Sequence, residues 1–176
     1  YQAELANGFG NLASRVLAMN AKYFDGRVPE AGPEQASDAE IRELAARAAV
    51  TADERINAFA IHDAIAAVWE LVDALNGYIT EQEPWALAKE ESKRERLGTV
   101  LYTATEGLRA LAELLHPVIP AATAKLWSAL GAEAQLGALE DQPLREAGLW
   151  GRIAAGVEQQ PLAVLFPRID AEGDTK

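Results

Sequence analysis

Hydrophobic residues recur along most of this chain at intervals of three and four, the spacing that buries one stripe of an α-helix. The clearest run contains Ile61, Ile65, Val68, Trp69, Val72, Leu75 and Ile79. The first run contains Leu5, Phe9, Leu12, Val16 and Met19. These patterns predict one helix from Glu4 to the turn pair Asp25-Gly26 and another over about 60–80.

Three further helices are predicted from start and stop signals. Ser37 and Glu40 have the spacing of a capping box, with Ser37 as N-cap, for a helix that ends near Ile56. A fourth helix covers about 92–115. A fifth covers 121–130, with Pro120 at its start and Gly131 at its end.

Beyond Gly131 the periodicity weakens, and leucines and tryptophans are scattered among glycines and prolines. We therefore expect an all-α antiparallel helix bundle of about five helices in a single domain. Residues 1–130 form the bundle, and residues 131–176 form a loop-rich tail that packs back on it.

A second, polar stripe lies on the first predicted helix. It consists of Asn7, Asn11, Arg15 and Lys22, and the helical spacing places them on one shared face. Such a face is most often only solvated. The same amide, guanidinium and ammonium groups are also those that contact nucleobase edges and phosphates.

Trp85 follows Pro84, which is suited to the first turn of a new short helix after the third one. The indole is therefore placed at a tight corner. A half-exposed indole can stack on an unpaired base. The alternative is a tryptophan that fills the corner as part of the core, and the residues themselves leave both open.

Composition narrows the classes of protein. The chain has 176 residues, of which 49% are apolar, and a formal net charge of −11. That charge excludes a broad basic footprint, so any contact with nucleic acid has to be local, and DNA is not expected as a partner. With no cysteine, disulfides and thiolate metal sites are excluded and a reducing compartment fits. No apolar run approaches the roughly 18 residues of a membrane span, and the first residues do not resemble a signal peptide.

No catalytic constellation is visible in the sequence. There is no glycine-rich phosphate loop, no nucleophile elbow and no histidine pair at metal-binding spacing. His62 and His116 are best interpreted as structural residues, the second as a cap or corner. The mixed charges over residues 89–96 indicate a solvated helix start. The chain is expected to bind something, with no metal and no catalytic residue of its own.

Several motifs together resemble one family. They are ELANGFGNLASR at 4–15, NAKYFDG at 20–26, WELV at 69–72, NGYI at 76–79, EPWALAK at 83–89, HPVIP at 116–120 and the segment 161–168. In this order and spacing, the chain resembles the C-terminal anticodon-binding domain of methionyl-tRNA synthetases. The Pro-Trp corner is the most particular of these motifs.

The resemblance implies that Asn11, Arg15 and Trp85 recognise the CAU anticodon of methionine tRNAs, chiefly its cytosine. Arg15 can donate to the ring nitrogen and carbonyl of cytosine, and the Asn11 carbonyl can accept from its amine. Uracil presents the opposite pattern at two of these atoms and leaves buried groups unpaired, at about 1–3 kcal/mol each. Asn7 and Lys22 are weaker candidates for neighbouring contacts with RNA.

The family's catalytic half, which activates methionine with ATP and carries a zinc knuckle in some members, has its signature motifs outside this chain. The chain is expected to be a cytoplasmic fragment of methionine–tRNA ligase, without activity of its own, that acts beside that half. Two alternatives remain. One is the equivalent domain of a class I synthetase for valine, isoleucine, leucine or cysteine, and the other is a helical protein–protein interaction module.

Overall fold

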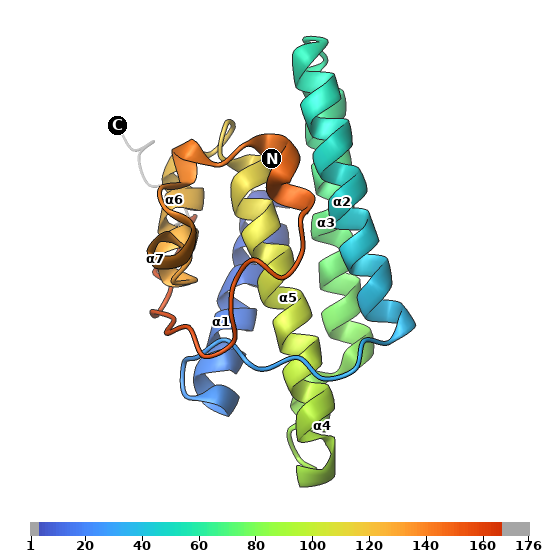
Figure 1. Cartoon of the computed structure of the whole chain (residues 1–176), viewed down its shortest axis with the longest axis vertical. Coiled ribbons are helices and arrows are strands. Elements are labelled where there is room, and N and C mark those ends of the chain that lie inside the picture. The colour runs from blue at the N-terminus through green and yellow to red at the C-terminus, as the bar shows by residue number, and fades with distance from the viewer. Residues whose placement is uncertain (1–3, 167–176) are drawn as a thin grey trace, which may run out of the picture.

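The computed structural model describes residues 4–166, which fold into a bundle of helices (Figure 1). The long helices are α1 (Asn11–Phe24), α2 (Ala36–Asn57), α3 (Ile61–Gln82), α5 (Arg94–Leu115) and α6 (Pro120–Ala129). The short helical segments are η1 (Glu4–Gly10), α4 (Pro84–Leu87), η2 (Glu91–Lys93), α7 (Glu133–Leu136), η3 (Leu139–Asp141) and η4 (Leu144–Gly148). Residues 4–166 contain no strand, only an isolated bridge between Arg27 and Glu158. The prediction of an all-α bundle with about five principal helices is confirmed.

Helices α2 and α3 form a long hairpin along one side of the molecule (Figure 1). Both helices bury apolar residues, among them Val68 and Val72 of α3 and the fully buried Ala45 and Ala49 of α2, which lie beside Gly148 of η4. The far end of the hairpin projects beyond the other helices (Figure 1). For this reason Ile61, predicted to be buried, is 48% exposed.

The start of α2 differs from the prediction. The helix begins at Ala36, and the backbone N–H of Gln35 donates to the carboxylate of Asp38 at 2.8 Å. The predicted capping box of Ser37 and Glu40 is therefore wrong. Asp38 takes the capping role because its carboxylate points inward, where it also accepts a hydrogen bond from the Tyr78 hydroxyl.

Helix α5 is the central element, with α1, α2, α3, α6 and the tail around it (Figure 1). An apolar stripe that contains Val100, Leu101, Leu108 and Leu111 is fully buried. The charged face of α5 is buried as well, because residues 147–153 of the tail cross over it. The sequence pattern shows only the first of these two faces.

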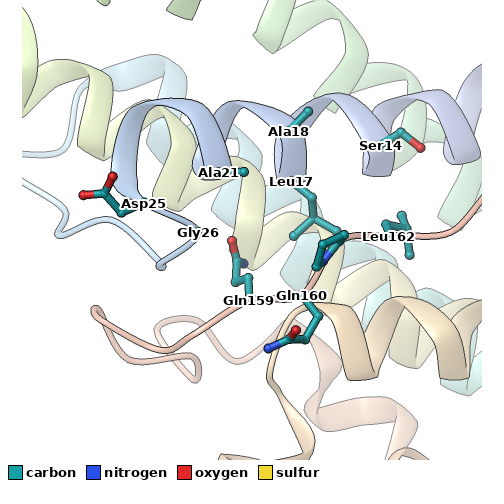
Figure 2. Close-up of a pocket in the computed structure, with 10 residues that line it drawn as sticks. Ser14, Leu17, Ala18, Ala21, Asp25, Gly26, Gln159, Gln160 and Leu162 are labelled. Carbon is teal, nitrogen blue, oxygen red and sulfur yellow. The ribbon is translucent and has the colours of Figure 1, made fainter.

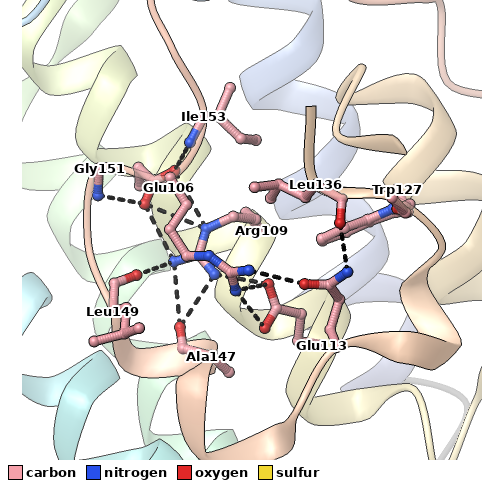
Figure 3. Close-up of polar contacts among 12 residues, drawn as sticks. Glu106, Arg109, Glu113, Trp127, Leu136, Ala147, Leu149, Gly151 and Ile153 are labelled. Carbon is pink, nitrogen blue, oxygen red and sulfur yellow. Dashed lines mark hydrogen bonds and ion pairs between the residues drawn. The ribbon is translucent and has the colours of Figure 1, made fainter. Parts of the chain in front are cut away.

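An ionic network joins that charged face to the tail (Figure 3). The Arg109 guanidinium is fully buried and donates to Glu106 and to Glu113, the latter at 2.8 Å. Glu113 also pairs with Arg152 at 3.0 Å. Burial raises the pKa of Glu113 above its ordinary value, although Arg109 and Arg152 oppose this shift.

Arg109 and Glu106 also bind the backbone of the tail directly. The guanidinium donates to the carbonyls of Ala147 and Leu149. The Glu106 carboxylate accepts from the backbone N–H groups of Gly151 and Ile153, each at 2.8 Å. These bonds satisfy the polar backbone of a segment that has little regular structure of its own.

The first predicted helix is present but is not uniform. It begins with the π-helical turn η1, continues as α1, and ends where Asp25 and Gly26 adopt positive φ angles of 52° and 70°. Residues 157–166, here called the C-terminal strap, return to this end of the bundle. The Gln159 N–H donates to the Gly26 carbonyl at 2.8 Å. The Phe166 ring centroid lies 6.4 Å from that of Phe9, so the end of the described chain lies beside its beginning.

Candidate nucleic-acid interface

The corner between α3 and α4 presents Trp85 at the surface. Glu83 adopts a left-handed conformation (φ 45°) that ends α3 and turns the chain into α4. Pro84, at the first position of α4, is buried and fixes the direction of the next residue. The Trp85 side chain is 38% exposed, so the indole offers part of its surface to a ligand.

Arg15 of α1 lies against this indole. Its guanidinium carbon is 5.8 Å from the centroid of the Trp85 ring, a cation–π contact. Two candidates from distant parts of the sequence are thus brought together. Asn11, one turn earlier on α1, is exposed on the same face.

The two weaker candidates are also exposed on this part of the chain. Asn7 is exposed in η1 and lines, together with Asn11, a hollow between α1 and the strap. Lys22 is exposed near the end of α1, with its ammonium 5.2 Å from the centroid of the Tyr23 ring. Residues 5–24 contain these two cations, Arg15 and Lys22, and no acidic residue, so α1 is locally positive in a chain of net charge −11.

A network of polar groups holds the corner in place. Arg96 donates to both oxygens of Asp38 and to the side-chain oxygen of Gln82, the last residue of α3. It thereby ties α2, α3 and α5 together beside the turn that carries Trp85. The interpretation of residues 89–96 as a solvated run is therefore wrong for Arg96. The inward position of Arg96 could have been predicted from its spacing of four residues from the buried Val100, which places both on the inward face of α5.

The network also shifts the ionisation of its members. Burial alone would raise the pKa of Asp38, but hydrogen bonds from Arg96 and Tyr78 outweigh this effect and hold the pKa below its ordinary value. Burial and the neighbouring Asp38 carboxylate raise the pKa of Tyr78 above its usual range. Asp38 is therefore ionised and Tyr78 is neutral near pH 7.

The histidines take no part in this interface. The Nδ1 atom of His116, at the end of α5, lies 2.9 Å from the Thr123 hydroxyl, as expected of a corner residue. His62 is exposed near the start of α3, so its interpretation as a satisfied structural histidine is wrong. Among residues 4–166 there is no group of three His, Asp or Glu side chains that could hold a metal ion. In the same part of the chain no helix has the length and apolar character needed to span a membrane.

Comparisons with known proteins identify the family of the chain. The sequence profile of the family described as the anticodon-binding domain of tRNA ligase matches residues 38–160. The chain therefore belongs to the family of tRNA ligase anticodon-binding domains. The profile begins at Asp38, so α1 with Asn11 and Arg15 lies outside the matched region.

The relatives found are methionine–tRNA ligases. A methionine–tRNA ligase of Streptomyces coelicolor is 48% identical over 173 residues, which are 97% of this chain and 32% of that protein. One from Deinococcus radiodurans is 40% identical over 175 residues, 98% of this chain and 24% of that protein. The chain thus spans about a third or less of the length of these relatives.

A solved structure supports the same assignment. The structure of Mycobacterium tuberculosis methionyl-tRNA synthetase in complex with methionyl-adenylate matches with a TM-score of 0.84 and 34% sequence identity. The match covers 94% of this chain and 31% of that chain. The resemblance to the methionyl-tRNA synthetase domain is confirmed, and the two alternative classes are not favoured.

Proposed function

We propose that this chain recognises the CAU anticodon loop of methionine tRNAs on the face formed by α1 and the α3–α4 corner. Asn11, Arg15 and Trp85 are the contacting residues, and Asn7 and Lys22 extend the surface. The observation that carries the proposal is the Arg15 guanidinium on the half-exposed Trp85 indole, 5.8 Å from the ring centroid.

The contact also suggests how the site works. In the free protein the guanidinium occupies the surface on which a base would stack. An incoming cytosine takes that place, because indole–base stacking contributes about 1–3 kcal/mol per base. The displaced guanidinium then turns its N–H donors toward the ring nitrogen and carbonyl of the same base. Stacking and hydrogen bonding are thus coupled through one side chain.

In the full-length protein, this domain would hold the tRNA for a catalytic part that lies outside the present sequence. That part would activate methionine with ATP and transfer it to the tRNA in the cytoplasm, and any zinc site belongs to it. Neither DNA nor a membrane is among the proposed partners. With a net charge of −11, the chain alone should bind RNA weakly and with a strong dependence on salt.

The test is fluorescence anisotropy with a CAU anticodon stem-loop and a UAU stem-loop at low salt. The parent chain should prefer the CAU loop, and Trp85→Ala and Arg15→Ala should abolish this preference. Arg15→Lys keeps the charge but loses the planar fork, so it should retain weak binding without the preference. Arg47→Ala removes an exposed arginine of α2 and serves as the charge-matched control. Equal affinity of the parent for both loops would contradict the proposal.

A further inference from the structure

A groove runs along the side of α1 that faces the C-terminal strap (Figure 2). Its main hollow has a volume of about 610 Å³, within the usual range of ligand sites. From α1 it is lined by Ser14, Ala18 and Ala21, and from the strap by Gln159, Gln160 and Leu162. A separate hollow of about 260 Å³, lined by Asn7 and Asn11, lies next to it, and Ser14 borders both.

The walls of the groove are formed without a ligand. The Gln160 N–H donates to the Ala129 carbonyl and the Gln159 N–H to the Gly26 carbonyl, each at 2.8 Å. The Val28 N–H donates to the Val157 carbonyl at 2.9 Å. Residues 157–160 of the strap are thus fixed to the bundle through their backbone.

Beneath the groove lies an amide pair whose hydrogen bonds are incomplete. Asn20 is fully buried and donates from Nδ2 to Gln159 Oε1 at 2.9 Å and to Thr105 Oγ1 at 3.0 Å. The Gln159 side chain rises from the strap toward Ala21 of α1 (Figure 2) and is only 7% exposed. Its Nε2 donor and the Asn20 Oδ1 acceptor have no hydrogen-bond partner among the described residues. Both atoms are buried, and of the two residues only Gln159 lines the groove. A buried donor without a partner is costly, and an acceptor on a ligand would satisfy Gln159 Nε2 once the side chain turns toward the groove.

The charges around the groove disfavour a phosphate as the ligand. Asp25 lines one end of the hollow, and the last carbonyl groups of α1 lie at that end, where the helix dipole is negative. Both features repel an anion. A neutral planar group that carries hydrogen-bonding atoms along its edge is compatible with them, and an unpaired nucleobase has this chemistry.

The groove and the Arg15–Trp85 contact lie on opposite flanks of the exposed ridge of α1. Ser14 and Ala18 on this ridge have small, exposed side chains. An RNA strand can cross close to the helix there, with one base on each flank. We propose that the groove takes a second unpaired base of the same RNA loop that Trp85 binds. This inference rests on the proposed function and adds a second subsite to it.

The test uses Ala21→Leu, which fills the groove from an exposed helical position, and Gln159→Met, which removes the amide and keeps the length of the side chain. Ala124→Leu, at an exposed position of α6, is the matched control. Circular dichroism confirms that each variant is folded. Affinities are measured by anisotropy for the CAU stem-loop and for a series of loops with one abasic nucleotide each.

Both groove variants should weaken binding of the intact loop about tenfold, whereas Ala124→Leu should not. For one abasic position the effect of the groove variants should disappear, because the base that they exclude is already absent. The effect of Trp85→Ala on affinity should disappear for a loop whose abasic nucleotide is at a different position.

The inference is overturned, with the proposed function intact, if Trp85→Ala weakens binding and Ala21→Leu does not. It is also overturned if Ala21→Leu weakens binding equally at every abasic position, since the substitution then acts through the scaffold. If Trp85→Ala is without effect as well, the proposed function itself fails.

Discussion

Substitution of Arg109 by methionine tests the buried ionic network directly. The guanidinium donates to the carboxylates of Glu106 and Glu113 and to two carbonyls of the tail, and it has no exposed surface. Methionine fills a similar volume but leaves both carboxylates without this cation. Removal of one partner from a buried ion pair costs about 3–5 kcal/mol. We expect a loss of free energy of unfolding within this range and no larger, because Arg152 still pairs with Glu113 and backbone N–H groups still bind Glu106.

A loss of about 3–5 kcal/mol is a large part of the 5–15 kcal/mol by which a typical domain is stable. Urea denaturation followed by the helical circular-dichroism signal at pH 7 measures it. Addition of Glu106→Gln to Arg109→Met should recover part of the loss, because Glu106 is then the carboxylate without a cation and a neutral amide is less costly to bury. Arg47→Met, at an exposed position, should stay within about 0.5 kcal/mol of the parent.

Two outcomes would refute this reasoning. If Arg109→Met is within about 1 kcal/mol of the parent, the guanidinium does not stabilise the network. If the double variant is no more stable than the single one, the loss does not come from an unpaired carboxylate. Amide hydrogen exchange at Gly151 and Ile153 locates the effect, since these groups donate to Glu106 and should exchange faster in the variant.

Two further predictions concern pH and backbone. The pKa of Asp38 is held below its ordinary value of 3.8, so its stabilising effect is present above that pH and is lost as the pH falls through the folded-state pKa. The difference in unfolding free energy between the parent and Asp38→Asn should therefore shrink below about pH 4, and a constant difference would contradict the assignment. Gly77→Ala should raise stability by about 0.5–1 kcal/mol, because a Cβ there meets nothing within 4 Å. Gly98→Ala should lower stability by about 1–3 kcal/mol, because its Cβ would lie 2.6 Å from the Glu30 carbonyl oxygen, and equal thermal midpoints for the two variants would contradict the packing described.

The long helices could be predicted because each buries one stripe, and the spacing of Val68, Val72, Leu75 and Ile79 shows that stripe directly. The second face of α5 could not be predicted in this way. Glu106, Arg109 and Glu113 have the spacing of a solvated ionic face, and only the position of the tail makes them buried. Local pattern shows that these charges share a face of the helix but not what covers it.

Some features of the candidate site could likewise be predicted from local sequence, and others could not. Helical spacing placed Asn11 and Arg15 on one face, and Pro84 indicated a corner at Trp85. The proximity of Arg15 and Trp85 is a tertiary contact, and before the structure only the family resemblance suggested it. The amide pair of Asn20 and Gln159 joins residues 139 positions apart, and no local pattern indicates it.

That separation has a consequence for synthesis on the ribosome. The first helix emerges early, but its partner in the amide pair follows only after 139 further residues, about 7–28 s at typical elongation rates. In the first part of this interval α5, which ends at Leu115, is also missing, so the apolar stripe of α1 has neither the strap nor α5 to cover it. The α2–α3 hairpin is local in sequence and can form during this interval. We therefore expect this part of the nascent chain to resist proteolysis first in the α2–α3 hairpin, and in α1 only when translation of the domain is nearly complete.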